Sequence, residues 1–552
     1  MKKTLLLACL LGIVYYASAQ GLQSPEQFLG YPIGKKYTRH HRIVDYFRAV
    51  AQARPDMVKM EKYGETNEGR ELVLAFISSP ENMARLEAIR SNNLGLAGIG
   101  GSGSAEQAPA IVWFSYNVHG NETSSSEAAM MTLYALTDPA NTQTKEWLKN
   151  TVVVIDPCIN PDGRDRYVNW FNGMVGKEAN ADAAAREHAE PWPGGRSNHY
   201  NFDLNRDWAW QTQVESRQRL KEYSRWLPQV HVDFHEQGSN EPYYFAPAAD
   251  PFHEVITPWQ RDFQVMIGKN NAKYFDSNGW LFFTKERFDL LYPSYGDTYP
   301  IYNGSIGMTF EQGGGGRAGL AIVKADGDTL TLLDRATHHY TTGLSTIETA
   351  SKNRQKLIDE YRKYFEDGRN AKGAEYKAYV LTSRDENKIR SIIQLLEQNG
   401  IEYGTVSNKN FHGFNYNTGK DESYADEGFH VAVSAYQSKS VLARVLMEPK
   451  TVVTDSNTYD ITAWALPYVY GVKGYAVKEK LDIANNWKPA AAISPVASAY
   501  GLLMPYQSFN AAKVIAYLLK HDVKVRFAEK PFSYGGKNYE RGTLIILRTG
   551  NP

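Results

Sequence analysis

Histidine and glutamate stand three residues apart where an apolar stretch of the chain ends. The run from Ala110 to Tyr116 is rich in β-branched and aromatic residues and predicts a buried strand. His119 and Glu122 follow it, and the serines at 124–126 offer caps for a helix. A histidine and a carboxylate at such a strand-to-helix junction can bind one face of a Zn²⁺ ion. Taken alone, a pair of this kind is more often an ordinary surface pair.

Other apolar stretches further along the chain also end on polar residues. The predicted strand at 152–155 leads to the turn sequence Asn-Pro-Asp-Gly at 160–163, after which about 35 residues are expected to form a loop-like insertion. An alternating strand ends on His235, and another strand ends on Glu311. Donors at the ends of strands can form an open metal site, which leaves a position for water.

These blocks together resemble the zinc carboxypeptidase family, the carboxypeptidase A-like metallopeptidases. The resemblance covers about residues 30–350 and lies in the order and approximate spacing of the blocks. They are His119-x-x-Glu122, Asn-Pro-Asp-Gly at 160–163, Asp-Leu-Asn-Arg at 203–206, Asp-Phe-His at 233–235 and Thr-Phe-Glu at 309–311.

The resemblance implies a catalytic site built around one zinc ion per chain. His119, Glu122 and His235 would hold the metal and leave a fourth position for water. Glu311 would be the general base that takes a proton from this water and gives it to the leaving amine. The alternatives are a structural role for His235 and a surface position for Glu311.

Three residues of the 203–206 block are implied to support the metal and to bind substrate. Asp203 would accept the outer N–H of a ligand imidazole and so fix its tautomer. Asn205 and Arg206 would bind the terminal carboxylate of a peptide, for which a planar guanidinium is suited. The alternative for Arg206 is a structural ion pair.

Two assignments within the family pattern stay open at the level of sequence. An arginine that stabilises the oxyanion is expected after the 160–163 turn, and Arg164 and Arg166 are equal candidates. The tyrosine that covers the substrate is one of a cluster. Tyr292 and Tyr295 are the leading candidates, and Tyr299 and Tyr302 lie in the same region.

The expected function is that of an exported zinc-dependent metallocarboxypeptidase acting on the C-termini of peptides or proteins. No acidic residue can be placed at the base of the specificity pocket, so the sequence supports no strong preference for basic C-terminal residues. An alternative is a zinc amidase or peptidase that cleaves cell-wall (peptidoglycan) peptides. A less favoured alternative is a non-catalytic binding protein.

The N-terminus predicts export. Residues 1–19 combine two lysines, an apolar core and an Ala-Ser-Ala cleavage site, which is typical of a signal peptide. No other stretch reaches 18 apolar residues, so no stable membrane insertion is expected after cleavage, and the destination is periplasmic or extracellular. The 61 basic and 61 acidic residues balance, which gives no sign of a nucleic-acid partner.

The expected fold class is α/β. Residues 20–368 should form a three-layer α/β/α catalytic domain with a mixed central sheet, as the resemblance implies. Residues 376–552 should form a smaller α/β domain of unknown role, with an amidotransferase-like domain as one possibility. No cysteine follows Cys158, which excludes cysteine-based catalysis there. The chain ends directly after a predicted strand, which suggests a truncated sequence.

Overall fold

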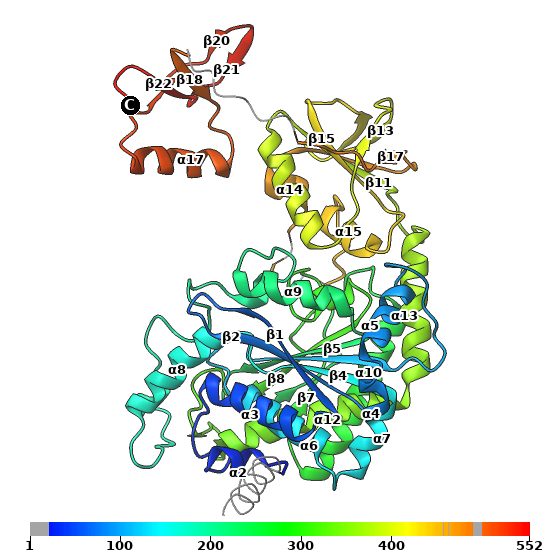
Figure 1. Cartoon of the computed structure of the whole chain (residues 1–552), viewed down its shortest axis with the longest axis vertical. Helices are drawn as coiled ribbons and strands as arrows, with labels where there is room; N and C mark the ends of the chain where they lie inside the picture. Colours follow the sequence, from blue (N-terminus) through cyan, green and yellow to red (C-terminus); the bar gives the residue numbers. More distant parts are fainter. Residues whose placement is uncertain (1–20, 456, 462, 490–498, 552) are drawn as a thin grey trace, which may run out of the picture.

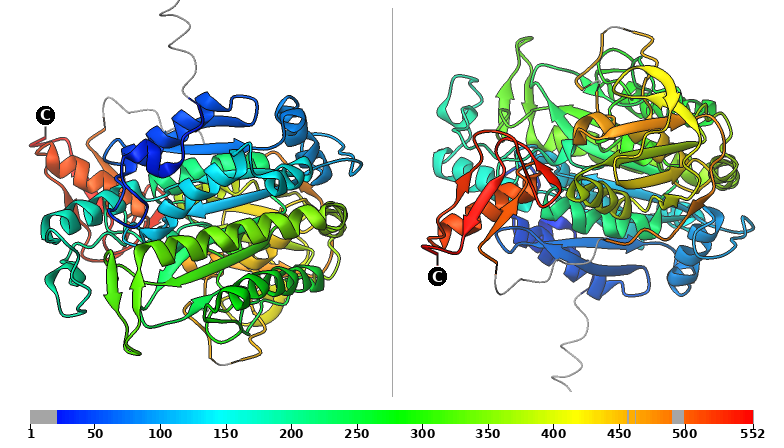
Figure 2. Two further views of the ribbon diagram at one scale, coloured as in Figure 1. Left: turned by 90° about the horizontal axis from the view of Figure 1, so that it is seen from below. Right: turned by 90° about the horizontal axis from the view of Figure 1, so that it is seen from above.

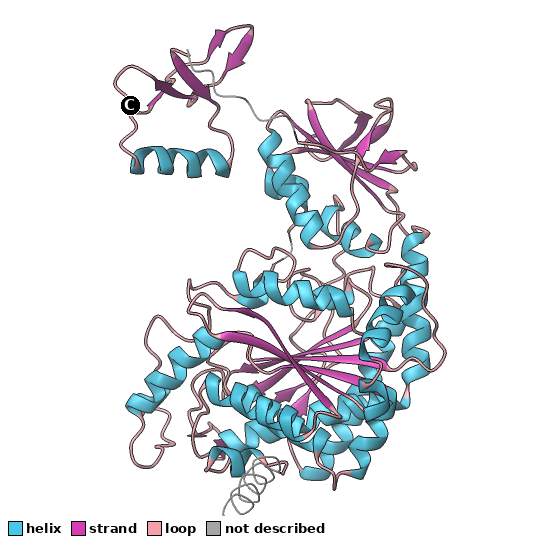
Figure 3. Ribbon diagram, viewed as in Figure 1, coloured by secondary structure: helices cyan, strands magenta, loops and turns pink. Residues whose placement is uncertain are grey.

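The structure is a computed structural model that describes residues 21–455, 457–461, 463–489 and 499–551 (Figure 1). The expected signal peptide at 1–19 lies outside these residues. The described chain has a large unit around an eight-stranded sheet, a second unit around a five-stranded sheet, and a small group of elements at 501–551 (Figures 1 and 3).

The eight-stranded sheet is mixed, as predicted. Its order is β1-β2-β4-β3-β5-β8-β6-β7, and β4, β3, β5 and β8 run parallel at its centre. The pairs β1–β2, β2–β4 and β6–β8 are antiparallel. The strands are β1 Val58–Glu65, β2 Glu71–Ile77, β3 Ala110–Tyr116, β4 Thr151–Asp156, β5 Val230–Gln237, β6 Tyr243–Tyr244, β7 Phe282–Phe283 and β8 Ile306–Gly313.

Alternate side chains of the central strands enter two different cores, as the pleat of a strand requires. On β3, Ile111 and Trp113 face one core, whereas Val112, Phe114 and Tyr116 face the other. Helices cover both faces, which confirms the three-layer arrangement (Figures 1 and 2). One layer contains α5 Leu86–Leu96 and α9 Val214–Trp226; the other contains α3 His40–Ala53, α6 Ser124–Thr137, α10 Pro258–Asn278 and α12 Leu332–Lys352.

The Asn-Pro-Asp-Gly segment begins a helix rather than a turn and a loop. α8 spans Pro161–Met174, so the predicted insertion is irregular mainly after this helix. Asn160 caps it, because its side chain accepts a hydrogen bond from the Gly163 N–H, and Pro161 suits the first helical position. The turn-forming residues therefore serve as a helix start.

The remaining elements of the large unit are mostly short or lie at its edges, and the longest of them, α13, follows α12 and ends the unit. They are α2 Pro25–Leu29, α4 Pro80–Met83, α7 Thr142–Asn150, α11 Thr298–Ile301, β9 Ala321–Val323, β10 Thr329–Thr331 and α13 Arg354–Arg369, with single 3₁₀ turns at Arg186–His188 and Leu204–Arg206.

The second unit has a five-stranded sheet of order β14-β13-β16-β11-β15, in which every pair is antiparallel. Its strands are β11 Ala378–Ser383, β13 His412–Asn415, β14 Lys420–Ser423, β15 Phe429–Ser434 and β16 Lys473–Val477, and β12 Thr405–Val406 pairs with β17 Ile483–Ala484. Its helices are α14 Glu386–Gln398, α15 Ser440–Met447 and α16 Leu466–Tyr470. The predicted domain limit at 368 lies in the last turn of α13, and the limit at 376 falls between α13 and β11.

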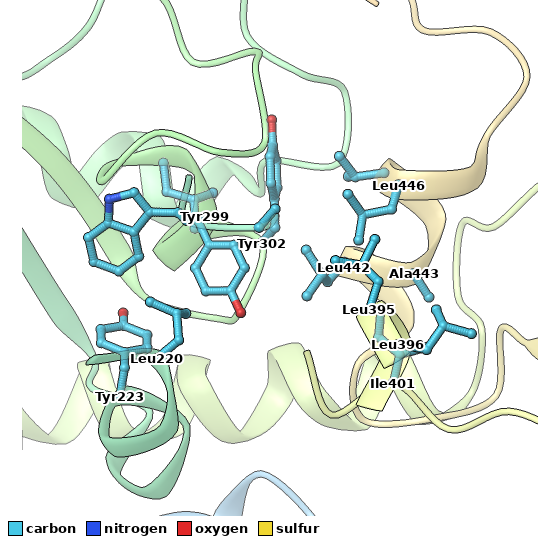
Figure 4. Packing of buried hydrophobic residues seen from close by; sticks show 14 of the residues in the cluster. Leu220, Tyr223, Tyr299, Tyr302, Leu395, Leu396, Ile401, Leu442, Ala443 and Leu446 are labelled. Atoms are coloured by element: carbon cyan, nitrogen blue, oxygen red, sulfur yellow. The ribbon is translucent and has the colours of Figure 1, made fainter. Parts of the chain in front are cut away.

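The large unit and the second unit share one buried apolar core. Tyr299 and Tyr302 of the first unit face Leu442 and Leu446 of α15 (Figure 4). Polar contacts join the same surfaces, since Asn399 accepts a hydrogen bond from the Tyr299 hydroxyl at 2.9 Å. The second unit is therefore packed onto the helix layer that contains α9.

The C-terminal elements are β18 Gly501–Met504, α17 Phe509–Lys520, β19 Arg526–Phe527, β20 Phe532–Tyr534, β21 Lys537–Tyr539 and β22 Leu544–Leu547. Within the part of the chain that is described, no helix has both the length and the apolar content needed to cross a bilayer.

Candidate metal and catalytic site

His119, Glu122 and His235 come together at the carboxyl edge of the central sheet. His119 and Glu122 follow β3, and His235 lies on the adjacent strand β5. The Nδ1 atom of His119 is 2.8 Å from Glu122 Oε1, and that of His235 is 3.1 Å from Glu122 Oε2. One ligand atom of each residue lies within 4.8 Å of the others, and all three side chains are buried.

The outer nitrogen of each imidazole faces a second carboxylate. His119 Nε2 is 2.9 Å from Asp203 Oδ1, and His235 Nε2 is 3.2 Å from Asp233 Oδ2. Such partners fix the tautomer of a ligand histidine, so that its other nitrogen is free of hydrogen and faces the metal. The pattern of the 203–206 block had suggested Asp203 for this position, whereas Asp233 had not been singled out.

These residues fit a zinc ion. The two inward Nδ1 atoms are 3.2 Å apart. Two nitrogen ligands at about 2.0–2.1 Å from one tetrahedral zinc ion would lie roughly 3.3 Å apart. Burial alone would raise the pKa of Glu122, but His119 and His235 together lower it, so this carboxylate is ionised as a ligand must be.

Glu311 lies directly beside this group because β5 and β8 are paired in register. His235 on β5 is the partner of Glu311 on β8. Burial raises the pKa of the Glu311 carboxyl to about 8, the two histidines oppose this effect, and Glu122 adds to it. A carboxyl group whose pKa lies near neutrality can both accept and donate a proton.

A cavity of about 280 Å³ opens at this edge of the sheet, and three of these four residues line it. Its walls carry both charges and two tyrosines, which distinguishes it from an apolar pocket. Besides His119, Glu122 and Glu311, it is lined by Arg196, Asn205, Arg206, Glu236, Gln237, Arg287, Phe288, Asp289, Tyr295, Asp297, Thr309 and Tyr459.

Asn205 and Arg206 reach this cavity from the short 3₁₀ turn after Asp203. Asn205 Oδ1 accepts a hydrogen bond from the Gly296 N–H at 2.8 Å, which fixes its amide. The guanidinium of Arg206 lies over the ring of Tyr295, 4.7 Å from its centre. Tyr295 therefore borders the cavity and supports the arginine.

Tyr292 is turned away from the cavity and does not line it. Its hydroxyl accepts a hydrogen bond from the Trp210 indole N–H at 2.6 Å. Tyr299 and Tyr302 are buried in the shared core. Of the four tyrosines in this segment, the structure thus brings only Tyr295 to the cavity wall.

The two arginines expected for the oxyanion are also outside the cavity, which corrects that expectation. Arg164 is buried, where it pairs with Glu127 at 2.8 Å and donates to the backbone oxygens of Thr38 and Thr123. Arg166 donates to the backbone oxygens of Gly194 and Asn198. Both arginines belong to α8. The helix directs the side chain of Arg164 into the protein and that of Arg166 towards the 175–203 loop.

Arg196 is the arginine of that loop which does line the cavity. Its Nη2 donates to Asp203 Oδ2 at 3.0 Å, and its Nη1 is 3.5 Å from Glu122 Oε1. Asn160 holds it in place by donating to the Arg196 carbonyl oxygen at 3.1 Å. The Pro-Gly-Gly-Arg sequence at 193–196 gave no signal for this role, because the fold of an irregular loop decides it.

Glu236 contributes its backbone to the site, since its N–H donates to Glu122 Oε2 at 2.8 Å, whereas its side chain is buried. Its carboxylate pairs with Arg335 of α12 at 2.8 Å and accepts from Ser124 at the start of α6 and from the Gly315 N–H. Gly314 must be glycine at this point, since its φ is +156° and a Cβ there would come within 2.0 Å of Glu236. This network fixes the glycine-rich loop after Glu311.

A second group of potential ligands, Glu68, Asp162 and His199, also lies within 4.8 Å. Its carboxylates already have cationic partners, since Arg70 pairs with Glu68 and with Asp162 at 2.7 Å. Asp162 additionally accepts from Thr66 at 2.7 Å. We therefore assign this group to an ion-pair network that joins the β1–β2 turn to α8.

Comparison with known families finds a match over part of the large unit. The zinc carboxypeptidase family model matches residues 43–229. The match contains His119, Glu122 and Arg206 and ends just before β5, so His235 and Glu311 lie beyond it. No curated protein matches the chain.

Several solved structures share a distant likeness with the chain. A metallo-carboxypeptidase from Burkholderia cenocepacia is 15% identical, with a TM-score of 0.40 over 56% of this chain and 68% of that one. A carboxypeptidase A from Helicoverpa armigera is 14% identical, with a TM-score of 0.39 over 65% and 80%. A metallo-carboxypeptidase from Pseudomonas aeruginosa is 13% identical, with a TM-score of 0.38 over 59% and 70%. Likenesses of this size assign no role to a residue.

Proposed function

We propose that this chain, whose residues 43–229 match the zinc carboxypeptidase family model, is a zinc-dependent metallocarboxypeptidase that hydrolyses C-terminal peptide bonds. Members of the family are hydrolases with one catalytic zinc ion. The proposal rests on one observation above all. The His119–Glu122–His235 group and Glu311 meet at one cavity, on adjacent strands of a sheet.

His119, Glu122 and His235 would hold the metal. When bound, zinc lowers the pKa of a water molecule and polarises the carbonyl group of the scissile bond. Asp203 and Asp233 would keep both imidazoles in the tautomer that presents Nδ1 to the ion.

Glu311 would move the proton during the reaction. Its carboxylate takes a proton from the attacking water and later donates it to the nitrogen of the leaving amine. Glu311 is buried in the cavity wall. Burial raises the pKa of its carboxyl group to about 8, which suits a group that must both accept and donate a proton.

Arg196 and Arg206 would bind the negative charges of the substrate. Arg196 lies beside Glu122 and would stabilise the oxygen anion that forms at the attacked carbonyl, which its nearness to the proposed metal ligand supports. Arg206 and Asn205 would bind the terminal carboxylate. Tyr295, whose ring lies against the guanidinium of Arg206, would cover the end of the substrate.

Export would bring the protein to a periplasmic or extracellular site. The proposal rests on the basic, apolar and small-residue pattern of residues 1–19. Expression in a secreting host, followed by determination of the N-terminal residue, tests it; a mature chain that begins at Gln20 would agree with the proposal.

The position of cleavage in a peptide tests the proposed activity. We expect the zinc-loaded protein to release single residues from C-terminal ends, as a ladder in a mass spectrum, and a chelator to stop this release. Glu311→Gln should lower kcat at least a hundredfold while the protein retains zinc, because the ligands are unchanged. Asp455→Asn, an exposed change outside the cavity, serves as the control.

Three outcomes would contradict the proposal. Full activity of Glu311→Gln would exclude Glu311 as the base. Internal fragments instead of a ladder would indicate an endopeptidase. Cleavage of muropeptides, with no cleavage of ordinary peptides, would indicate the alternative cell-wall substrate.

A further inference from the structure

Two residues of the second unit lie at the candidate site. Tyr459 and Asp460 belong to the segment between α15 and α16. Tyr459 lines the cavity, its backbone N–H donates to Asp289 Oδ2 at 2.6 Å, and its ring packs on Phe288 with 5.2 Å between the ring centres. The second unit therefore completes the wall of the cavity.

Asp460 binds the arginine that would anchor a substrate. Its Oδ2 atom accepts a hydrogen bond from Arg206 Nε at 2.9 Å and lies 2.8 Å from Arg206 Nη2 in an ion pair. A carboxylate on these two donors uses one of the two edges by which a guanidinium binds an anion bidentately.

The other edge of the guanidinium is also engaged. Arg206 Nη1 donates to the Asn205 carbonyl oxygen at 3.1 Å and lies 3.8 Å from Asp203 Oδ2. A free C-terminal carboxylate that enters the cavity therefore meets an arginine with both edges occupied in part, and it also meets the negative charge of Asp460. Both effects weaken its binding.

The packing of the second unit keeps Asp460 at this place. Glu448, at the end of α15, hydrogen-bonds to His253 of the first unit at 2.7 Å. Trp464, four residues after Asp460, lies against Tyr292, with 6.1 Å between the ring centres. A carboxylate held in this way competes at a high effective concentration, since no encounter is needed.

We propose that Asp460 is a specificity-determining residue, which sets how strongly the site depends on a free terminal carboxylate in its substrate. By occupying Arg206, the side chain lowers the advantage of a free C-terminus over a blocked one. The proposal deepens the proposed function and rests on it, because it takes Arg206 as the carboxylate anchor.

Binding of a matched pair of peptides tests this role. The pair would be one N-acylated tripeptide with a free C-terminus and the same peptide as its C-terminal amide. Calorimetry on zinc-loaded Glu311→Gln protein gives Kd for each without turnover. Adding Asp460→Asn should lower the Kd of the free acid by roughly three- to tenfold, the size expected for a partly exposed ion pair, and leave that of the amide within about twofold.

Two further variants separate charge from packing. Asp460→Glu keeps the carboxylate and should stay near the parent protein. Asp455→Asn removes a carboxylate from the same segment without contact to Arg206 and should change neither Kd. Hydrolysis by protein with an intact Glu311 should then show the Asp460→Asn effect in KM for the free acid, with kcat changed less than twofold.

An unchanged ratio of the two Kd values, or weaker binding of the free acid, would overturn the proposal, because Asp460 would then be neutral or would position Arg206. Absence of binding by every variant would overturn it as well. Failure of the proposed function is distinct, since it would appear as no peptide hydrolysis by the unmutated protein and would leave the binding comparison intact.

Discussion

Burial and the charges of neighbouring side chains shift the pKa values of several acidic residues around the site in opposite directions. Histidine contacts lower the pKa of Glu122 and Asp203 in spite of burial. For Glu311, burial outweighs the opposing effect of the two histidines and raises the pKa to about 8; for Asp297, burial raises the pKa to about 7. The site thus combines carboxyl groups with lowered pKa values and others with raised pKa values, as the proposed division between a metal ligand and a general base requires.

Asp297 should make the stability of the fold depend on pH. Burial, with smaller contributions from Asp233 and Asp289, raises its pKa from 3.8 to about 7. A raised carboxyl pKa stabilises the fold fully below pH 3.8, and the contribution is lost as the pH rises towards 7. Asp297→Asn does not titrate and can keep the hydrogen bonds to Thr298 and Thr309.

The free energy of unfolding in urea measures this effect at pH 5 and pH 8. The difference between Asp297→Asn and the unmutated protein should shift in favour of the variant by about 2–3 kcal/mol over this range. Asp328→Asn, a change of a side chain that is 83% exposed, should show no such shift. A constant difference for Asp297→Asn would mean that the buried carboxyl does not titrate in this range.

The start of α8 connects the stability of an element to the position of Arg196. Asn160 Oδ1 accepts from the Gly163 N–H at 3.0 Å, and Asn160 Nδ2 donates to the Arg196 carbonyl oxygen at 3.1 Å. A Cβ at Gly163 would come within 2.3 Å of the Gly195 carbonyl oxygen, so the helix start and this loop pack in direct contact.

Asn160→Ala should lower the free energy of unfolding by about 1–2 kcal/mol through the lost cap. Asn160→Ser keeps a capping oxygen but cannot donate across to Arg196. Both variants lose the hydrogen bond to the Arg196 carbonyl, so we expect kcat to fall in both. The serine variant should recover most of the free energy of unfolding, while its kcat stays below that of the unmutated protein. Equal recovery of both would show that Asn160 acts on the helix alone. Denaturant unfolding and peptide kinetics provide the two measurements.

Strands and helices with a clear periodic spacing of apolar residues were predictable from sequence, and irregular segments were not. The strands before His119, His235 and Glu311 are continuous apolar or alternating runs, and the parallel register brings their ends together. The Asn-Pro-Asp-Gly segment was misread because its residues serve equally in a turn and at a helix start. α12 was missed, and with it the Arg335–Glu236 pair that fixes the loop after Glu311.

At the scale of the whole molecule, contacts between distant segments were beyond sequence reasoning. A structural ion pair was the alternative for Arg206, and the structure contains such a pair with Asp460. Nothing in the pattern around Asp460 identifies it as a partner of Arg206, since the pairing depends on how the second unit packs on the first. The same holds for Arg196, which the 175–203 loop carries to the cavity.

The shared core makes the two units depend on each other. Leu442 is fully buried between α15 and the tyrosines of the first unit (Figure 4). Leu442→Ala should cost about 2–5 kcal/mol, as for other buried leucines, and should loosen both units. Hydrogen exchange measured by mass spectrometry should therefore rise in α9 and α11 as well as in α15.

Val380 provides the matched comparison, because it is equally buried but lies in the separate apolar cluster on the other face of the second sheet. Val380→Ala should raise exchange in β11 and its neighbours and leave α9 protected. If Leu442→Ala also left α9 protected, the two units would be energetically independent. Asp460 would then be held near Arg206 only by its local contacts, and its competition for the substrate carboxylate would weaken accordingly.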